Sequence, residues 1–168
     1  MAWRRLHAYI VKVANAISVT MLILLSITLF VGVLSRYVFS YSIPELEVIR
    51  KFSLMWLVFV GSALAVKEKV HLEIDIFSEY LSEKMVKVKG IIVYILSFFG
   101  MSILITIGFT AFQAGLDRTE LVPIRFLSEQ PSLIYYYSAF LIGSILMLYF
   151  HICKSKEHFI SNDEVNKQ

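Results

Sequence analysis

Charged residues of both signs gather in one short segment, Pro44–Lys51. Glu47 lies three residues before Arg50 and four before Lys51, and side chains at these spacings meet on one face of a helix. A carboxylate beside two cations could form an ion-paired cluster that faces protein rather than lipid, as charges inside membranes usually do. The alternative is a helix entrance whose long cationic side chains snorkel to the membrane surface.

Sequence patterns typical of enzymes are absent. None of the four histidines has a partner at the spacing of metal ligands; they are His7, His71, His151 and His158. There is no glycine-rich phosphate loop, and no serine or cysteine nucleophile motif. We therefore predict no catalytic activity, no metal, no cofactor and no nucleic-acid partner.

The chain is apolar enough to lie largely within a lipid bilayer. Of its 168 residues, 58% are hydrophobic and only 17% are charged, whereas soluble domains carry about 25% charged residues. Four charge-free stretches divide the sequence, and about 20 apolar residues suffice to cross a membrane. We predict a single all-α membrane domain, 1–168, with four transmembrane helices at 14–34, 44–66, 90–116 and 131–153. A polar tail, 154–168, should fray.

The second span needs a local argument, because its charge-free stretch, Phe52–Val66, is short. Pro44 suits the first turn of a helix, where its missing N–H costs nothing. Glu45 and Glu47 in the same turn complement the helix dipole. The second helix is therefore expected to begin at Pro44.

The segment Lys67–Lys89 is predicted to contain a short amphipathic helix. Its apolar residues recur at helical spacing from Phe77 onward: Phe77, Tyr80, Leu81, Met85 and Val88. Such a helix would lie on the membrane surface or dock on a partner, and the pattern does not distinguish the two.

Small residues four apart indicate close helix packing in lipid. The pairs are Thr28–Gly32, Gly61–Ala65, Ala111–Gly115 and Ala139–Gly143.

Lysine and arginine counts indicate the orientation, since cytoplasmic segments are rich in both. The N-terminus, the middle loop and the tail hold eleven, against five on the other side, where Arg50 and Lys51 at the entrance of the second span are counted with the first loop. Both termini are therefore predicted to be cytoplasmic.

No acidic residue lies in the first span, and no span centre carries a charge. Ion or proton paths usually need ionisable groups inside the membrane. The chain is thus expected to work with a partner, and a stand-alone small carrier or channel is the alternative.

One ordered set of residues is more specific. It runs from Arg36-Tyr37 through Pro44-Glu45-Leu46-Glu47 and a run containing Trp56 and Gly61, to His71 and Asp75. This set resembles the small membrane subunit of tripartite ATP-independent periplasmic (TRAP) transporters. Arg50-Lys51 is more basic than the pattern of that family.

The resemblance implies a bacterial inner-membrane scaffold beside a large membrane subunit. In such transporters a periplasmic binding protein captures an organic acid, such as a C4-dicarboxylate or sialic acid, and the large subunit moves it with sodium. By the same resemblance, structural or interface roles are expected for Arg36, Glu45, Glu47, Trp56, Gly61, His71 and Asp75. We add Arg50 and Lys51 to the predicted interface because of the charge cluster described above.

Overall fold

Four long helices make up the fold of the computed structural model, which describes residues 2–68, 83–122, 124 and 129–165. They are α1 (Ala2–Val38), α2 (Glu45–Glu68), α3 (Glu83–Leu116) and α4 (Ile134–Val165). Each is long and apolar enough to cross a membrane. This confirms the predicted all-α membrane architecture with four spans.

The helix boundaries follow local sequence signals at some ends and not at others. α2 begins at Glu45, directly after Pro44, as the proline and the acidic first turn predict. α4 begins at Ile134 rather than at position 131, and it continues to Val165, so the expected fraying of the tail is not observed up to that residue.

The predicted surface helix is not seen among the described residues. α3 begins at Glu83, not at position 90, so Met85 and Val88 belong to the first turns of this long helix. Phe77, Tyr80 and Leu81 lie outside the described residues. Since α3 passes position 90 without a break, the last part of the predicted surface helix is the start of α3, whose membrane-spanning part runs from Val88 to Leu116.

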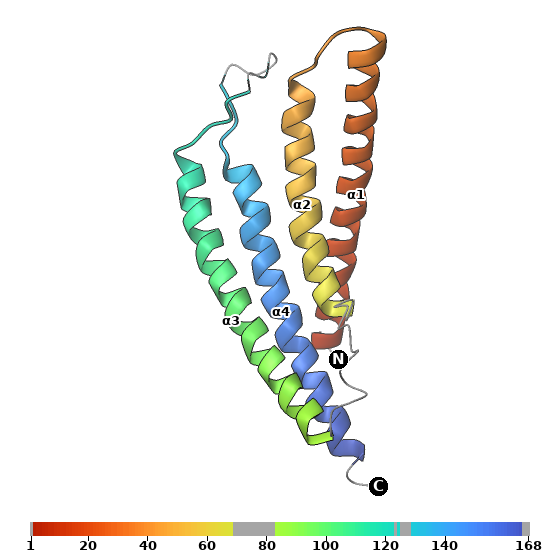
Figure 1. Cartoon of the computed structure of the whole chain (residues 1–168), viewed down its shortest axis with the longest axis vertical. Helices are drawn as coiled ribbons and strands as arrows, with labels where there is room; N and C mark the ends of the chain where they lie inside the picture. Colours follow the sequence, from red (N-terminus) through yellow and green to blue (C-terminus); the bar gives the residue numbers. More distant parts are fainter. Residues whose placement is uncertain (1, 69–82, 123, 125–128, 166–168) are drawn as a thin grey trace.

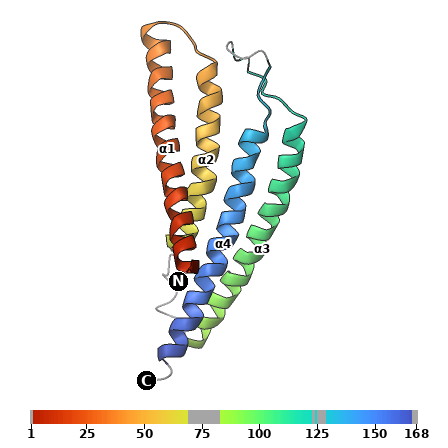
Figure 2. The same cartoon turned by 180° about the vertical axis from the view of Figure 1, so that it is seen from behind.

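The helices stand in a row in the order α1, α2, α4, α3 (Figures 1 and 2). α2 packs against α1 and α4, while α3 packs against α4. In the most apolar part of each span, 22% of the residues of α2 and 39% of those of α4 are buried, against 6% in each of the edge helices α1 and α3. Both termini lie at one end of the row, together with the end of α2 and the beginning of α3 (Figure 1).

The core lies between the two central helices, in the half nearer the termini. Val60 and Ala63 of α2 are fully buried, and Phe150 of α4 is 1% exposed. Ala14 of α1 joins the same cluster. The row is therefore held together most firmly at the end that carries both termini.

Glycine marks the closest approaches between helices. A Cβ atom added at Gly143 would lie 2.5 Å from Cβ of Phe59, and one at Gly115 would lie 2.6 Å from Cδ2 of Tyr137. Two of the small-residue pairs, Ala139–Gly143 and Ala111–Gly115, are thus at tight contacts, which confirms their predicted role. Gly61 differs, because a Cβ atom there would have no neighbour within 4 Å.

Candidate functional site

The charge cluster at the start of α2 is built around Lys51. Its Nζ lies 3.3 Å from Oε1 of Glu47 and 3.5 Å from Oε1 of Glu120. The side chains of Glu47 and Lys51 are 53% and 45% exposed, whereas that of Glu120 is 5% exposed. The spacing argument correctly joins Glu47 to Lys51. Glu120 is distant in sequence, and no pattern pointed to it.

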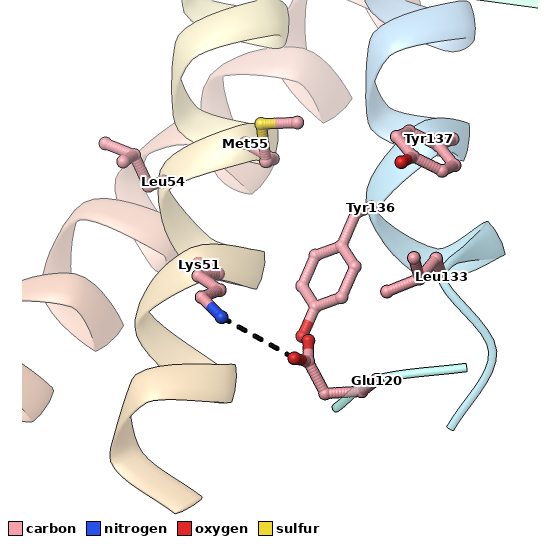
Figure 3. Close-up of a pocket in the computed structure, with 7 residues that line it drawn as sticks. All are labelled: Lys51, Leu54, Met55, Glu120, Leu133, Tyr136 and Tyr137. Atoms are coloured by element: carbon pink, nitrogen blue, oxygen red, sulfur yellow. Dashed lines mark ion pairs between the residues drawn. The ribbon is translucent and has the colours of Figure 1, made fainter. Parts of the chain in front are cut away.

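Glu120 is placed by the loop between α3 and α4. Its backbone N–H donates to the carbonyl of Pro131 at 2.9 Å, and the N–H of Leu133 donates to the carbonyl of Arg118 at 2.9 Å. These two bonds pair the two sides of the loop as short antiparallel backbone segments. From this position the carboxylate of Glu120 reaches Lys51 of α2 (Figure 3).

The start of α4 is fixed by Ser132. Its Oγ donates to the carbonyl of Gly115 at 2.6 Å and accepts from the N–H of Ile134 at 3.3 Å. The first bond satisfies a carbonyl at the end of α3, and the second satisfies an N–H at the start of α4, which are groups that helix ends otherwise leave unpaired. Ser132 therefore links the two helices next to Glu120.

Tyr136 completes the cluster from α4. The hydroxyl of this buried residue points at the Glu120 carboxylate (Figure 3) and lies 3.4 Å from the carbonyl of Val48. A hydroxyl has one proton to donate, and the ionised carboxylate of Glu120 is a stronger acceptor than the carbonyl of Val48. The hydroxyl of Tyr136 therefore donates its hydrogen bond to Glu120. Burial would raise the pKa of Glu120, but the Tyr136 hydrogen bond, the charge of Lys51 and the Val122 backbone together lower it below its ordinary 4.5.

A cavity of about 290 Å³ lies beside this cluster, between α2 and α4. It is lined by Lys51, Leu54, Met55, Glu120, Leu133, Tyr136 and Tyr137 (Figure 3). Most of the lining is apolar, and the charged groups in it are paired with one another. The cluster thus joins the α3–α4 loop to α2, and this contact is structural.

Trp56 also connects the two central helices. Its Nε1 donates to the carbonyl of Tyr135 at 3.3 Å, and its ring contacts Phe52, which in turn contacts Tyr136. Of the other residues suggested by the sequence, Arg36 is exposed in the last turn of α1, and Glu45 is half-buried in the first turn of α2. His71 and Asp75 lie outside the described residues.

Arg50 does not join the cluster, although its spacing from Glu47 allows it. One terminal nitrogen lies 3.9 Å from where Gly32 of α1 would carry a Cβ atom. The Nε atom is buried without a hydrogen-bond partner. Over the described parts of the chain, Arg50 makes no ion pair, and Glu47 pairs with Lys51 instead.

Comparison with known proteins adds two similarities. Residues 25–160 match the family described as "Tripartite ATP-independent periplasmic transporters, DctQ component". A protein of Haemophilus influenzae named "Putative TRAP transporter small permease protein" is 33% identical over 73 residues. That alignment covers 44% of this chain and 45% of the relative, so the chain matches less than half of that protein.

Proposed function

Because the chain belongs to the DctQ component family of TRAP transporters, we propose that it is the small membrane subunit of a sodium-coupled transporter for organic acids. Members of this family are transporter subunits and not enzymes. The chain is a multi-pass protein of the inner membrane, with four spanning helices. Its proposed partners are a large membrane subunit and a periplasmic substrate-binding protein, and its proposed cargo is a C4-dicarboxylate or a sialic acid.

The observation that carries this proposal is the family match, which runs from within α1 to within α4. The charge distribution supports a scaffold role. The described charges of α2 lie in its first two turns and its last turn, so its centre offers no ionisable group of the kind that conducts ions or protons. The Lys51–Glu120 cluster, in turn, joins parts of this chain to one another.

The proposal predicts that transport depends on all three components. Reconstituted alone in vesicles with an inward sodium gradient, the chain should take up neither labelled succinate nor labelled sialic acid. Uptake of one of them should appear when the large subunit and the binding protein are added. Uptake by the chain alone, if abolished by a substitution within it, would instead establish the stand-alone carrier.

Topology gives a second prediction. The start of α1, the end of α2, the start of α3 and the end of α4 share one end of the row (Figure 1), and the excess of lysine and arginine in the segments that flank these helix ends favours the cytoplasm. Green fluorescent protein fused after Gln168 should fluoresce, and alkaline phosphatase fused there should be inactive. A phosphatase fused after Ser40, in the loop between α1 and α2, should be active. The reverse pattern would invert the proposed orientation.

A further inference from the structure

The cavity between α2 and α4 has a charged end and an apolar end. Lys51 and Glu120 lie at one end, while Met55 and Tyr137 lie at the other (Figure 3). Leu54 belongs to the lining and is 47% exposed. The cavity of about 290 Å³ is therefore open to the surroundings of α2 on the side of Leu54.

This cavity lies where the polar and apolar parts of a bilayer meet. The charges in the first two turns of α2 end at Lys51, and the charge-free stretch begins at the next residue, Phe52. Leu54 and Met55 lie about one helical turn beyond Lys51, towards the middle of the span. An apolar cavity stays dry but accepts apolar molecules. The charged end is thus at the level of lipid headgroups, and the apolar end is at the level of acyl chains.

The charged end also restricts which headgroup fits. The two carboxylates of Glu47 and Glu120 and the ammonium of Lys51 leave one net negative charge, and the Glu47 side chain is 53% exposed. A second ammonium group can donate charge-assisted hydrogen bonds to Glu47. Lys51 has three N–H donors, and two carboxylates use two of them, so the third is available to a phosphate oxygen. A headgroup with an ammonium and a phosphate matches these groups, whereas a net negative headgroup does not.

We propose that this cavity binds one phospholipid whose headgroup carries a primary ammonium group. The ammonium pairs with Glu47, the phosphate accepts from Lys51, and one acyl chain occupies the apolar end beside Leu54 and Met55. A choline headgroup binds less tightly, because its quaternary nitrogen has no N–H to donate. The site requires only this chain and a bilayer, so it does not depend on the proposed transport function.

Native mass spectrometry of the full chain tests this site. The chain is reconstituted with equal amounts of phosphatidylethanolamine, phosphatidylcholine and phosphatidylglycerol, extracted in mild detergent, and weighed together with the lipid it retains. Phosphatidylethanolamine should be retained about fivefold more than phosphatidylcholine, equivalent to about 1 kcal/mol, and phosphatidylglycerol should be retained least. Equal retention of the three lipids, a preference for phosphatidylglycerol, or no retained lipid would overturn the proposal.

A first pair of variants locates the headgroup. Glu47→Gln should make the retention of phosphatidylethanolamine and phosphatidylcholine nearly equal, because the amide has no charge to pair with the ammonium. This change leaves Lys51 paired with Glu120, so the cluster keeps its contact between α2 and the loop. Glu68→Gln is the matched control, since its side chain is 56% exposed at the other end of α2, and it should keep the preference. An unchanged preference in Glu47→Gln would contradict the headgroup site.

A second pair locates the acyl chain. Leu54→Trp places a larger side chain at the edge of the cavity and should reduce the retained phosphatidylethanolamine about fivefold, equivalent to about 1 kcal/mol. Val58→Trp is the control, because Val58 is 48% exposed on the same helix but does not line the cavity. Unchanged retention in Leu54→Trp, or an equal loss in Val58→Trp, would show that the lipid is not held in this cavity.

Discussion

Replacing Gly143 with alanine is expected to lower the thermal unfolding midpoint of the chain in detergent. The added Cβ atom would lie 2.5 Å from Cβ of Phe59, 2.8 Å from its carbonyl carbon and 2.9 Å from its carbonyl oxygen. Backbone atoms cannot rotate out of the way as a flexible side chain can, so α2 and α4 must move apart. Overpacking of this kind costs about 1–3 kcal/mol.

The sign of this effect distinguishes packing from helix propensity. Alanine favours a helix over glycine by about 0.8–1.0 kcal/mol, so a glycine with free space around it should gain stability from the same change. Gly61→Ala and Gly100→Ala are the controls, because neither added Cβ atom would have a neighbour within 4 Å. If Gly143→Ala unfolds at or above the temperature of these controls, the close contact of α2 and α4 is not as described.

Glu120→Ala is expected to release the α3–α4 loop from α2. The substitution removes the buried carboxylate that pairs with Lys51 and hydrogen bonds with Tyr136. Breaking a fully buried ion pair costs about 3–5 kcal/mol. Here Lys51 is 45% exposed and keeps Glu47, so we expect a loss nearer the cost of an unsatisfied polar group, about 1–3 kcal/mol. Thermal unfolding measures the loss, and protease cleavage within the loop should become faster.

Glu129→Ala is the matched control, since Glu129 is an exposed glutamate of the same loop. It should leave both the unfolding temperature and the cleavage rate unchanged. Equal effects of the two substitutions would show that the loss of charge in the loop matters and the contact of Glu120 with Lys51 does not.

The same carboxylate makes the attachment of the loop sensitive to acid. The pKa of Glu120 is lowered from its ordinary 4.5 by Tyr136, Lys51 and Val122 acting together against burial. Because the folded state binds this proton less readily than the unfolded state, the contribution of Glu120 to stability is complete above pH 4.5 and is lost as the pH falls through the lowered pKa. Glu120→Gln should remove this part of the pH dependence, and protease cleavage of the loop measured at several pH values would show whether it does.

Local signals in the sequence predicted most of the fold. The four spans follow from the lengths of the charge-free stretches, and the start of α2 follows from Pro44 and the acidic residues after it. The start of α3 was predicted too late, at position 90. Charged residues at the beginning of a span do not end a helix, so the charges in Glu83–Lys89 extend α3 instead of separating it from a surface helix.

Contacts between residues far apart in the chain could not be predicted from the spacing of residues in the sequence. Lys51 was correctly joined to Glu47, four residues away, because helical geometry alone sets that distance. Its second partner, Glu120, depends on how the α3–α4 loop folds back beside α2. The small-residue pairs differ in the same way. Their spacing identified Gly61 and Gly143 equally. Only the arrangement of the helices shows that a Cβ atom added at Gly143 would meet Phe59, while one added at Gly61 would have no neighbour within 4 Å.

The order of the helices in space also bears on how the chain is made. α1 and α2 are neighbours in the sequence and in the row, so they can pair as soon as both have entered the bilayer. α3 is synthesised next, but it packs against α4 and not extensively against α1 or α2. During biosynthesis α3 therefore has no extensive packing partner in this row until α4 is made. α4 then joins α2 on one side and α3 on the other, so the fourth helix completes the packing of the row.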